Sequence, residues 1–167
     1  MDELIQWSFS WYYRYRMDTQ KTLPYNRKAR FNYTVLEKME CGISLVGTEV
    51  KSMREGRFNY TDSYVRIIDG ELWLIGFHIS EYKQGNLFNH DPDRKRRLLA
   101  HKQEIKRLRR KVDEKGYTLI PLQAYFKNGK IKLEIGICQG KKIHDKRKSI
   151  KDRDEKRSIE RAFKQKL

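Results

Sequence analysis

The sequence predicts a mainly β protein, a small closed β-barrel with a few packed α-helices and a basic C-terminal tail. Two segments of alternating apolar residues, 64–75 and 120–137, each contain a two-residue turn signal at their centre. Glycine turns are frequent between residues 30 and 138, and helical periodicity is rare there. A barrel suits such short strands because ring closure leaves no unpaired edge strand.

The N-terminal segment is rich in aromatic residues. Residues 1–16 contain Trp7, Phe9, Trp11 and three tyrosines, but they start with acidic residues and have no long apolar run. They are therefore not a secretory signal. Because chain termini are loose unless something ties them down, we predict a variable, poorly ordered leader over residues 1–24. Packing of the aromatic residues on the domain, stacking on bases and an early start codon remain as alternatives.

Alternation of apolar residues begins at Arg30 and predicts the first strand. The apolar positions are Phe31, Tyr33, Val35, Ile43 and Leu45, all in one phase. Gly42 lies within this pattern and predicts a bulge or a sharp bend.

Residues 47–56 predict a short helix. Thr48 is expected to be its N-cap, since a threonine hydroxyl can accept a hydrogen bond from a free backbone N–H of the first turn. Val50 and Met53 lie three positions apart on one face, and Gly56 is expected to end the helix.

The segment 64–75 predicts a β-hairpin. Asp69 and Gly70 favour a two-residue type I′ turn, and this turn sets the register of the two strands. The register places Val65 opposite Leu74, Ile67 opposite Leu72, and Arg66 opposite Trp73. One face is therefore aliphatic, which specifies the register strongly.

Residues 76–93 are rich in Gly, Asn, His and Asp and predict a long loop that is functional or mobile. A basic strand over 94–99 and a helix over 102–115 follow. The helix is expected to end at Gly116. Its buried stripe is Ile105, Leu108 and Val112.

The second hairpin turns at Asn128-Gly129, the strongest short hairpin signal. The predicted apolar pairs are Phe126 with Ile131, Ala124 with Leu133, Leu122 with Ile135, and Ile120 with Ile137. The opposite face pairs Tyr125 with Lys132 and Gln123 with Glu134. One side is therefore core, and the other is a wet surface with an aromatic residue beside a cation.

The composition changes after Cys138. Residues 140–167 hold 12 Lys or Arg against 5 Asp or Glu and few apolar residues. Such a segment cannot bury enough surface to fold alone, so we predict a basic tail that is disordered when free. Its good helix formers favour a helix on a polyanionic partner. A solvated charged helix without a target is the alternative.

The sequence shows no motif of a catalytic nucleophile, a nucleotide-binding loop or a metal site. Cys41 and Cys138 are too isolated for a metal site and predict two buried thiols in a reducing cytosol. The histidines are expected in loops or on the surface: His78, His90, His101 and His144. No apolar run is long enough to span a membrane. We therefore expect no enzyme activity, catalytic residue, metal, cofactor or membrane partner, and a cytoplasmic protein.

The net charge of the chain is +16, which points to a polyanionic partner. Residues 26–30 alone contain three cations in five positions. Cations neutralise phosphates, aromatic faces stack on exposed bases, and an Asn side chain can read a base edge or a 2′-OH. A solvated surface is the alternative for any one cluster, but the combination favours nucleic acid.

Seven segments, in this order and spacing, resemble the small protein B (SmpB) family of bacterial tmRNA-binding proteins. They are NRKARFNY (26–33), GTEVKSMREG (47–56), DSYVRI (62–67), NHDPDRKRRLL (89–99), EKGYTLIPL (114–122), YFKNGKIKLEIGI (125–137) and GKKIHDKR (140–147). The resemblance covers residues 25–167 and omits the leader. GKKIHDKR followed by a basic tail is its most specific part.

The resemblance implies an OB-like RNA-binding barrel over residues 25–139. It also implies a monomeric adaptor of trans-translation that binds the tRNA-like domain of tmRNA and delivers it to stalled ribosomes. The tail, residues 140–167, would enter the empty decoding site and the mRNA channel, contact small-subunit rRNA and become helical there.

The resemblance also implies two sets of site residues. The tmRNA face would contain Asn26, Arg27, Lys28, Arg30, Glu40, Leu99 and Lys132, and Tyr125 joins it because it shares the wet face of Lys132. The ribosome-binding residues of the tail would be Lys141, Lys142, His144, Asp145, Lys146 and Arg147. Glu40 is unexpected on such a face, and we interpret it as an acceptor for a base or 2′-OH, or as a group that holds a neighbouring Arg.

Two other functions are compatible with the residues alone. A general ribosome-associated or RNA-chaperone barrel without a dedicated RNA partner would carry the same charge. An RNA-modifying or hydrolytic enzyme is disfavoured because the nucleophile, base and metal set are missing.

Overall fold

The computed structural model of the chain describes residues 22–85 and 89–142, and positions 145, 147, 155, 157 and 158. Strands dominate this part of the chain, so the prediction of a mainly β fold is confirmed. The strands are β1 (Thr22–Tyr25), β2 (Tyr33–Ile43), β3 (Phe58–Asn59), β4 (Tyr64–Ile68), β5 (Glu71–Ile75), β6 (His78–Ile79), β7 (Arg96–Leu99), β8 (Thr118–Lys127) and β9 (Lys130–Gly140). The helices are α2 (Arg27–Asn32), α3 (Gly47–Arg54) and α4 (Lys102–Lys115).

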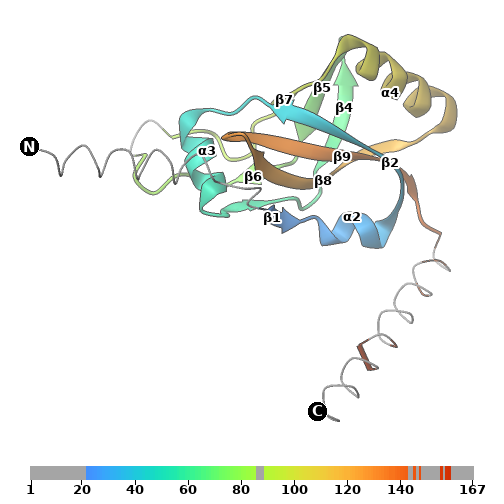
Figure 1. Cartoon of the computed structure of the whole chain (residues 1–167), viewed down its shortest axis with the longest axis horizontal. Coiled ribbons are helices and arrows are strands. Elements are labelled where there is room, and N and C mark those ends of the chain that lie inside the picture. Colours follow the sequence, from blue (N-terminus) through green and yellow to red (C-terminus); the bar gives the residue numbers. More distant parts are fainter. Residues whose placement is uncertain are drawn as a thin grey trace, which may run out of the picture.

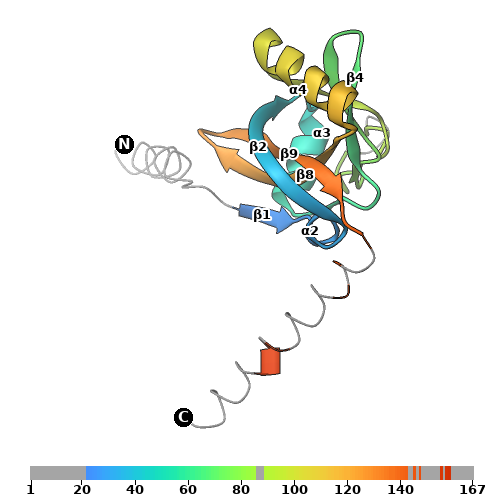
Figure 2. The same ribbon diagram turned by 90° about the vertical axis from the view of Figure 1, so that its right-hand side faces the viewer.

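The main sheet closes into a ring. Hydrogen-bonded neighbours follow the order β8-β4-β5-β7-β2-β9, and β9 pairs again with β8. All these pairings are antiparallel. β1 is attached to β8 outside the ring, and β3 pairs with β6 in a separate small sheet. Figures 1 and 2 show α4 along one side of the ring and α2 on the other.

The ring encloses the main hydrophobic core. Leu72 and Leu74 of β5 and Leu133 and Ile135 of β9 have no exposed surface. α3 and α4 contribute Met53, Ile105 and Leu108 to the same cluster. Burial of this apolar surface is the main favourable free energy of folding.

A second, smaller core lies under α2. Ala29 of this helix packs with Ile120, Leu122 and Cys138. β8 and β9 therefore carry apolar residues on both faces near α2, because Leu119 and Ile137 belong to the main core. The register shifts by one residue between Pro121 and Gln123 of β8. The alternation of side chains between the two faces of the strand is therefore offset by one position beyond this point.

The predicted pairs of Leu122 with Ile135 and of Ile120 with Ile137 are therefore wrong. Pro121 faces Ile135 and Ile120 faces Gly136, while Leu122 is the extra residue. The absence of a side chain at Gly136 makes room for Leu122, since a Cβ there would lie 2.9 Å from its Cδ1. The other predicted pairs of this hairpin are confirmed.

β2 carries a matching irregularity. The register shifts between Val35 and Glu37, not at Gly42 as predicted. Tyr33 and Val35 consequently pack with the second core, whereas Met39 contacts the main core, although all three have the same parity in the sequence. Gly42 instead is the residue at which β2 pairs with both β9 and β7.

The segment expected to begin the first strand is helical. The side-chain oxygen of Asn26 accepts a hydrogen bond from Ala29 N–H at 3.1 Å, which caps α2. Residues 30–32 therefore belong to α2, and β2 begins at Tyr33. β1 begins at Thr22 and buries Leu23, so the sheet starts within the segment assigned to the leader. Residues 1–21 lie outside the described part of the chain.

The first hairpin is confirmed in every predicted pair. Positive φ angles at Asp69 and Gly70 match the predicted type I′ turn. α4 and its stop at Gly116 are also confirmed.

Other boundaries differ from the prediction. α3 begins at Gly47 with Val46 as its N-cap, because Glu49 accepts a hydrogen bond from Val46 N–H. The strand predicted over 94–99 is shorter, β7. The predicted loop 76–93 contains β6, and Phe77 and Ile79 are fully buried within it.

Candidate nucleic-acid interface

Helix α2 presents the first group of predicted RNA-binding residues. Asn26 is buried, and its side-chain N–H donates to the carbonyl of Pro121 at 2.8 Å. Since its oxygen caps α2, both polar atoms of this side chain have partners within the protein. Asn26 therefore positions the helix in this structure, and we do not place it on the exposed surface.

The cations of α2 are on the surface. Arg27, Lys28 and Arg30 are exposed. The guanidinium of Arg30 lies over the ring of Tyr25, 4.3 Å from its centroid, which holds the side chain against the protein. The helix thus offers three cations on one small element.

The outer face of β2, β8 and β9 carries the second group. Tyr125 faces Lys132 across the hairpin, as predicted, and Lys132 faces Gly42 of β2. Glu40 of β2 accepts a hydrogen bond from the Tyr125 hydroxyl. Lys127 donates to the same carboxylate at 2.8 Å, and the Lys132 ammonium lies 3.9 Å from it. We call Glu40, Tyr125, Lys127 and Lys132 the Glu40 cluster.

The electrostatics of the Glu40 cluster follow from these contacts. The hydrogen bonds from Lys127 and Tyr125 hold the pKa of Glu40 below its ordinary value. Burial and the hydrogen bond to Glu40 raise the pKa of Tyr125. Glu40 is therefore a carboxylate and Tyr125 a neutral phenol at neutral pH, and the acid orders an aromatic ring and two cations.

Leu99 lies beside the Glu40 cluster. Leu99 of β7 is 48% exposed although it is a large apolar residue. It faces Gly42 across the strands, and a Cβ at Gly42 would lie 3.1 Å from the Leu99 Cβ. A groove is lined by Leu99, Glu40 and Lys132 together with Lys38, Arg107 and neighbouring residues. Three predicted residues from different strands therefore share one concave surface.

Lys38 of β2 is one of the residues that line this groove. Its ammonium pairs with Glu134 at 2.9 Å, and this hydrogen bond raises the pKa of Lys38. Tyr25 and Arg30 also act on that pKa through their charges. The predicted RNA face is therefore one surface that runs from α2 across β2 to the groove, with Asn26 underneath it.

The predicted ribosome-binding residues begin where β9 ends. Lys141 is half-buried, since its N–H donates to the carbonyl of Asn32 at 2.9 Å and its ammonium to that of Arg30 at 3.0 Å. Lys142 is exposed. Asp145 and Arg147 are exposed positions with helical backbone. His144 and Lys146 lie outside the described residues.

Sequence reasoning missed Lys127, Lys38 and Tyr25 on this surface. Lys127 is two positions from Tyr125 on the same strand, so strand alternation already placed the two on one face. Lys38 shares parity with Glu40 in β2 by the same rule. No sequence signal indicated that Arg30 would stack on Tyr25.

A buried ionic network was also missed. The Glu49 carboxylate is fully buried and accepts hydrogen bonds from Arg94 at 2.6 and 2.7 Å and from Arg96 at 2.8 Å. Burial raises the pKa of Glu49, but the bonds from Arg94, the Val46 N–H and Arg96 outweigh it and keep the pKa below its ordinary value. The network ties α3 to Arg94, which precedes β7, and to Arg96, the first residue of β7.

Both thiols and one of the described histidines are buried. Cys41 and Cys138 are buried free thiols, as predicted, and burial raises the pKa of Cys41 to about 12 and that of Cys138 to about 11. His90 lies in a loop, as predicted, but it is buried and is hydrogen-bonded to the Ile79 carbonyl and the Thr48 hydroxyl. Among the described residues, no group of three His, Cys, Asp or Glu side chains is placed to hold a metal ion. None of the described helices has the length and apolarity needed to cross a membrane.

A family model described as SmpB protein matches residues 23–165. The chain belongs to the SmpB family. The SsrA-binding protein of Treponema denticola is 58% identical over 144 residues, which cover 86% of this chain and 94% of that protein. The SsrA-binding protein of Thermosynechococcus vestitus is 53% identical over 149 residues, which cover 89% of this chain and 98% of that protein.

A solved structure is also similar to the chain. It is described as "tmRNA-SmpB: a journey to the center of the bacterial ribosome", and the TM-score is 0.62 at 49% sequence identity. The match covers 73% of this chain and 85% of the other. The SmpB family membership thus agrees with the ring-like sheet described above.

Proposed function

We propose that this SmpB-family chain is a tmRNA-binding adaptor of trans-translation. It binds the tRNA-like domain of tmRNA and delivers that RNA to stalled ribosomes. The ring of strands is an OB-like barrel, and the protein acts as a cytoplasmic monomer without catalysis. Relatives named SsrA-binding proteins and the similarity to a tmRNA-SmpB structure support this function.

The observation that carries the proposal is the groove beside the Glu40 cluster. Glu40, Leu99 and Lys132 come from β2, β7 and β9, yet they line one concave surface. The exposed Leu99 gives the groove an apolar wall, and the Glu40 cluster gives it oriented cations and an acceptor. An RNA loop needs this combination, because its bases offer apolar faces and polar edges beside phosphates.

We further propose a division of the chain into a leader, a barrel and a tail. The barrel and α2 hold tmRNA. The tail, with its net charge of +7 over residues 140–167, fills the empty decoding site and the mRNA channel. When the cations of the tail bind rRNA phosphates, counterions are released, and this release favours an ordered tail on the ribosome.

Selective RNA binding tests the proposal. The full chain should bind the tRNA-like domain of tmRNA far more tightly than bulk tRNA as the salt concentration rises, because base and shape contacts persist when counterion release weakens. Equal affinity for both RNAs at raised salt would favour a general RNA-binding barrel. A peptide-tagging assay with stalled ribosomes tests the adaptor step. A preparation of the protein that carries no bound metal or nucleotide should be fully competent in this assay.

A further inference from the structure

Tyr25 and Arg30 occupy the two positions that meet at the start of a helix. Asn26 is the N-cap of α2, so Tyr25 directly precedes the cap and Arg30 is the fourth residue of the helix. In many helices both positions carry apolar side chains, whose contact fixes the angle at which the chain enters the helix. Here the second partner is a cation, and its guanidinium carbon lies 4.3 Å from the centroid of the Tyr25 ring. The contact therefore fixes the place of a charge.

The Tyr25 ring is a fixed platform for this contact. β1 pairs with β8, and Leu23, two positions before Tyr25, is buried in the main core. The following N–H, that of Asn26, donates to the Leu122 carbonyl at 2.9 Å. The Tyr25 hydroxyl oxygen is buried and has no hydrogen-bond partner in the described part of the chain. The contact with Arg30 therefore depends on the ring and not on the hydroxyl.

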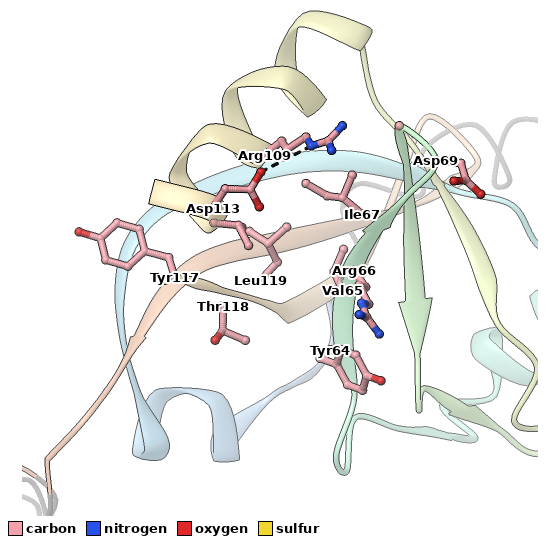
Figure 3. A pocket seen from close by; sticks show the side chains of 12 residues that line it. Tyr64, Val65, Arg66, Ile67, Asp69, Arg109, Asp113, Tyr117, Thr118 and Leu119 are labelled. Carbon is pink, nitrogen blue, oxygen red and sulfur yellow. Dashed lines mark ion pairs between the residues drawn. The ribbon is translucent and has the colours of Figure 1, made fainter. Parts of the chain in front are cut away.

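Stacking leaves the hydrogen-bond donors of Arg30 available. A guanidinium carries five N–H groups in its plane, and a ring on its face uses none of them. Two other surface arginines use their donors on carboxylates. Arg97 binds Glu71 at 2.9 Å, and Arg109 binds Asp113 at 3.5 Å, as Figure 3 shows for the second pair. Among the described residues, no carboxylate pairs with Arg30. Its planar fork is therefore available to a phosphate.

The stacked pair lies close to the groove beside the Glu40 cluster. Lys38 lines that groove, and the charges of Tyr25 and Arg30 both act on the pKa of Lys38. Lys38 is itself held by Glu134 at 2.9 Å. The protein thus fixes the two neighbouring cations by different means, one with a carboxylate and one with a ring.

A stacked guanidinium has less conformational freedom to lose when it binds. A free Arg side chain has many rotamers, and an RNA contact must restrict them. The ring already restricts the Arg30 side chain in the free protein, so a phosphate orders fewer torsions. The stack should therefore raise the affinity of a contact that Tyr25 itself does not make.

We propose that Tyr25 is a positioning residue for tmRNA binding, whose ring holds the Arg30 guanidinium in place for an RNA phosphate. The inference rests on the proposed function and adds a residue that the family resemblance does not supply. Tyr25 acts through Arg30, because its hydroxyl is buried and the guanidinium covers one face of its ring.

A double-mutant cycle on the affinity of the full chain for the tRNA-like domain tests the assignment. Tyr25→Leu keeps an apolar side chain but removes the aromatic face, and we expect binding about two- to fivefold weaker, the usual effect of an exposed cation–ring contact. Tyr25→Phe keeps the ring and should bind like wild type. In an Arg30→Leu background, Tyr25→Leu should cause no further loss. An equal loss in both backgrounds, a loss with Tyr25→Phe, or wild-type affinity of Tyr25→Leu would overturn the assignment.

The salt dependence of binding separates positioning from a direct contact. Arg30→Leu should reduce the slope of log affinity against log salt concentration by about one, because one phosphate contact is lost. Tyr25→Leu should leave the slope unchanged, because the charge of Arg30 remains. Tyr82→Leu is the matched control, since the Tyr82 ring lies 5.1 Å from the Lys51 ammonium in a similar contact on α3. That variant should change neither affinity nor slope. A slope that Arg30→Leu does not alter would contradict the phosphate contact.

These measurements separate the role of Tyr25 from the proposed function. If the wild-type chain selects the tRNA-like domain but Tyr25→Leu binds it as tightly as wild type, the role of Tyr25 is wrong and the adaptor function stands. If the wild-type chain does not select the tRNA-like domain, the proposed function itself fails.

Discussion

Glu40 shows how an acidic residue can serve a surface that binds polyanions. The carboxylate repels phosphate when it stands alone, but here it accepts hydrogen bonds from Tyr125 and Lys127 and lies near Lys132. It therefore orders a phenol ring and two ammonium groups before any RNA arrives. The sequence suggested two roles for Glu40, to accept a hydrogen bond from the RNA or to hold a neighbouring arginine. The structure contains the second arrangement, although Glu40 holds lysines and a tyrosine and not an arginine.

The charge reversal Glu40→Lys should weaken binding to the tRNA-like domain although it adds positive charge, because Lys127 and Tyr125 lose their common acceptor. A filter-binding titration measures the effect. Glu71→Lys is the matched control, since Glu71 is an acidic residue on the outside of β5 paired with Arg97. That variant should bind RNA as tightly as wild type or more tightly. Tighter binding by both variants would mean that Glu40 is only a solvated carboxylate.

Removal of the Lys132 ammonium should reduce affinity for the tRNA-like domain by about 1–3 kcal/mol, the usual effect of one specific RNA contact. The fold of Lys132→Ala should survive, because the side chain lies on the outside of the hairpin. The exposed Lys95, which is outside the groove, provides a charge-matched control. If Lys132→Ala and Lys95→Ala both bind the tRNA-like domain as tightly as wild type, the RNA face lies elsewhere.

Glu49 should be important for stability, not for RNA contact. Glu49→Gln leaves Arg96 buried without its counter-charge, and we expect a loss of about 3–5 kcal/mol in the free energy of unfolding. Glu71→Gln breaks an exposed pair and should cost only about 0–1 kcal/mol. Urea unfolding monitored by circular dichroism distinguishes the two. Equal, small losses would contradict a structural role for the network.

The same variant has a defined pH dependence. Because folding lowers the pKa of Glu49, its stabilisation is fully present above the ordinary value of 4.5 and is lost as pH falls through the folded-state pKa. The difference in unfolding free energy between wild type and Glu49→Gln should therefore be constant near neutral pH and shrink in acid below 4.5. A difference that does not change with pH would contradict the ionised state of Glu49.

Among the elements, α2 depends most on contacts that are distant in the chain. A six-residue helix is too short to be stable alone. Asn26 caps it and also bonds to the Pro121 carbonyl, while Ala29 packs on Ile120 and Leu122. The shifted registers of β2 and β8 create that apolar outer surface. The position of the α2 cations is therefore set by irregularities in two strands.

Asn26→Ala should lower stability by about 1–3 kcal/mol, because it removes a cap and leaves a buried carbonyl without its donor. Thermal unfolding measures this loss. The neighbouring exposed Arg27 offers a contrast, since Arg27→Ala should weaken RNA binding at an unchanged melting temperature. If Asn26→Ala unfolds like wild type yet loses RNA affinity, Asn26 contacts the RNA directly after all.

At the scale of the whole molecule, the barrel and the tail should have separable tasks. Truncation after Lys142 should leave stability and binding to the tRNA-like domain unchanged and abolish peptide tagging on stalled ribosomes. This end point keeps the two hydrogen bonds of Lys141 to α2, which truncation after Gly140 removes. The triple change of Asp145, Lys146 and Arg147 to Ala should reproduce most of the tagging defect. Full tagging by the truncated chain would contradict the division.

Local sequence patterns alone predicted many of the turns, helices and strand pairs of this protein. The type I′ turn at Asp69, the hairpin turn at Asn128, the amphipathic helix α4 and the pairing of Tyr125 with Lys132 were all predicted from the sequence. Each depends on neighbours in the chain, because a two-residue turn and alternating side chains determine a hairpin register without outside help. The family resemblance likewise predicted Glu40, Leu99 and Lys132 on one face before their proximity was known.

The tertiary structure decided which face of each strand packs in the main core and which packs against α2 or faces solvent. α2 requires apolar residues on the outside of the ring, so β2 and β8 each shift by one position, and sequence parity no longer indicates which face is core. It also paired Glu49 with Arg94 and Arg96 across more than forty residues, and brought Lys127 to Glu40. These contacts depend on packing between distant segments, and no local periodicity encodes which segments will meet.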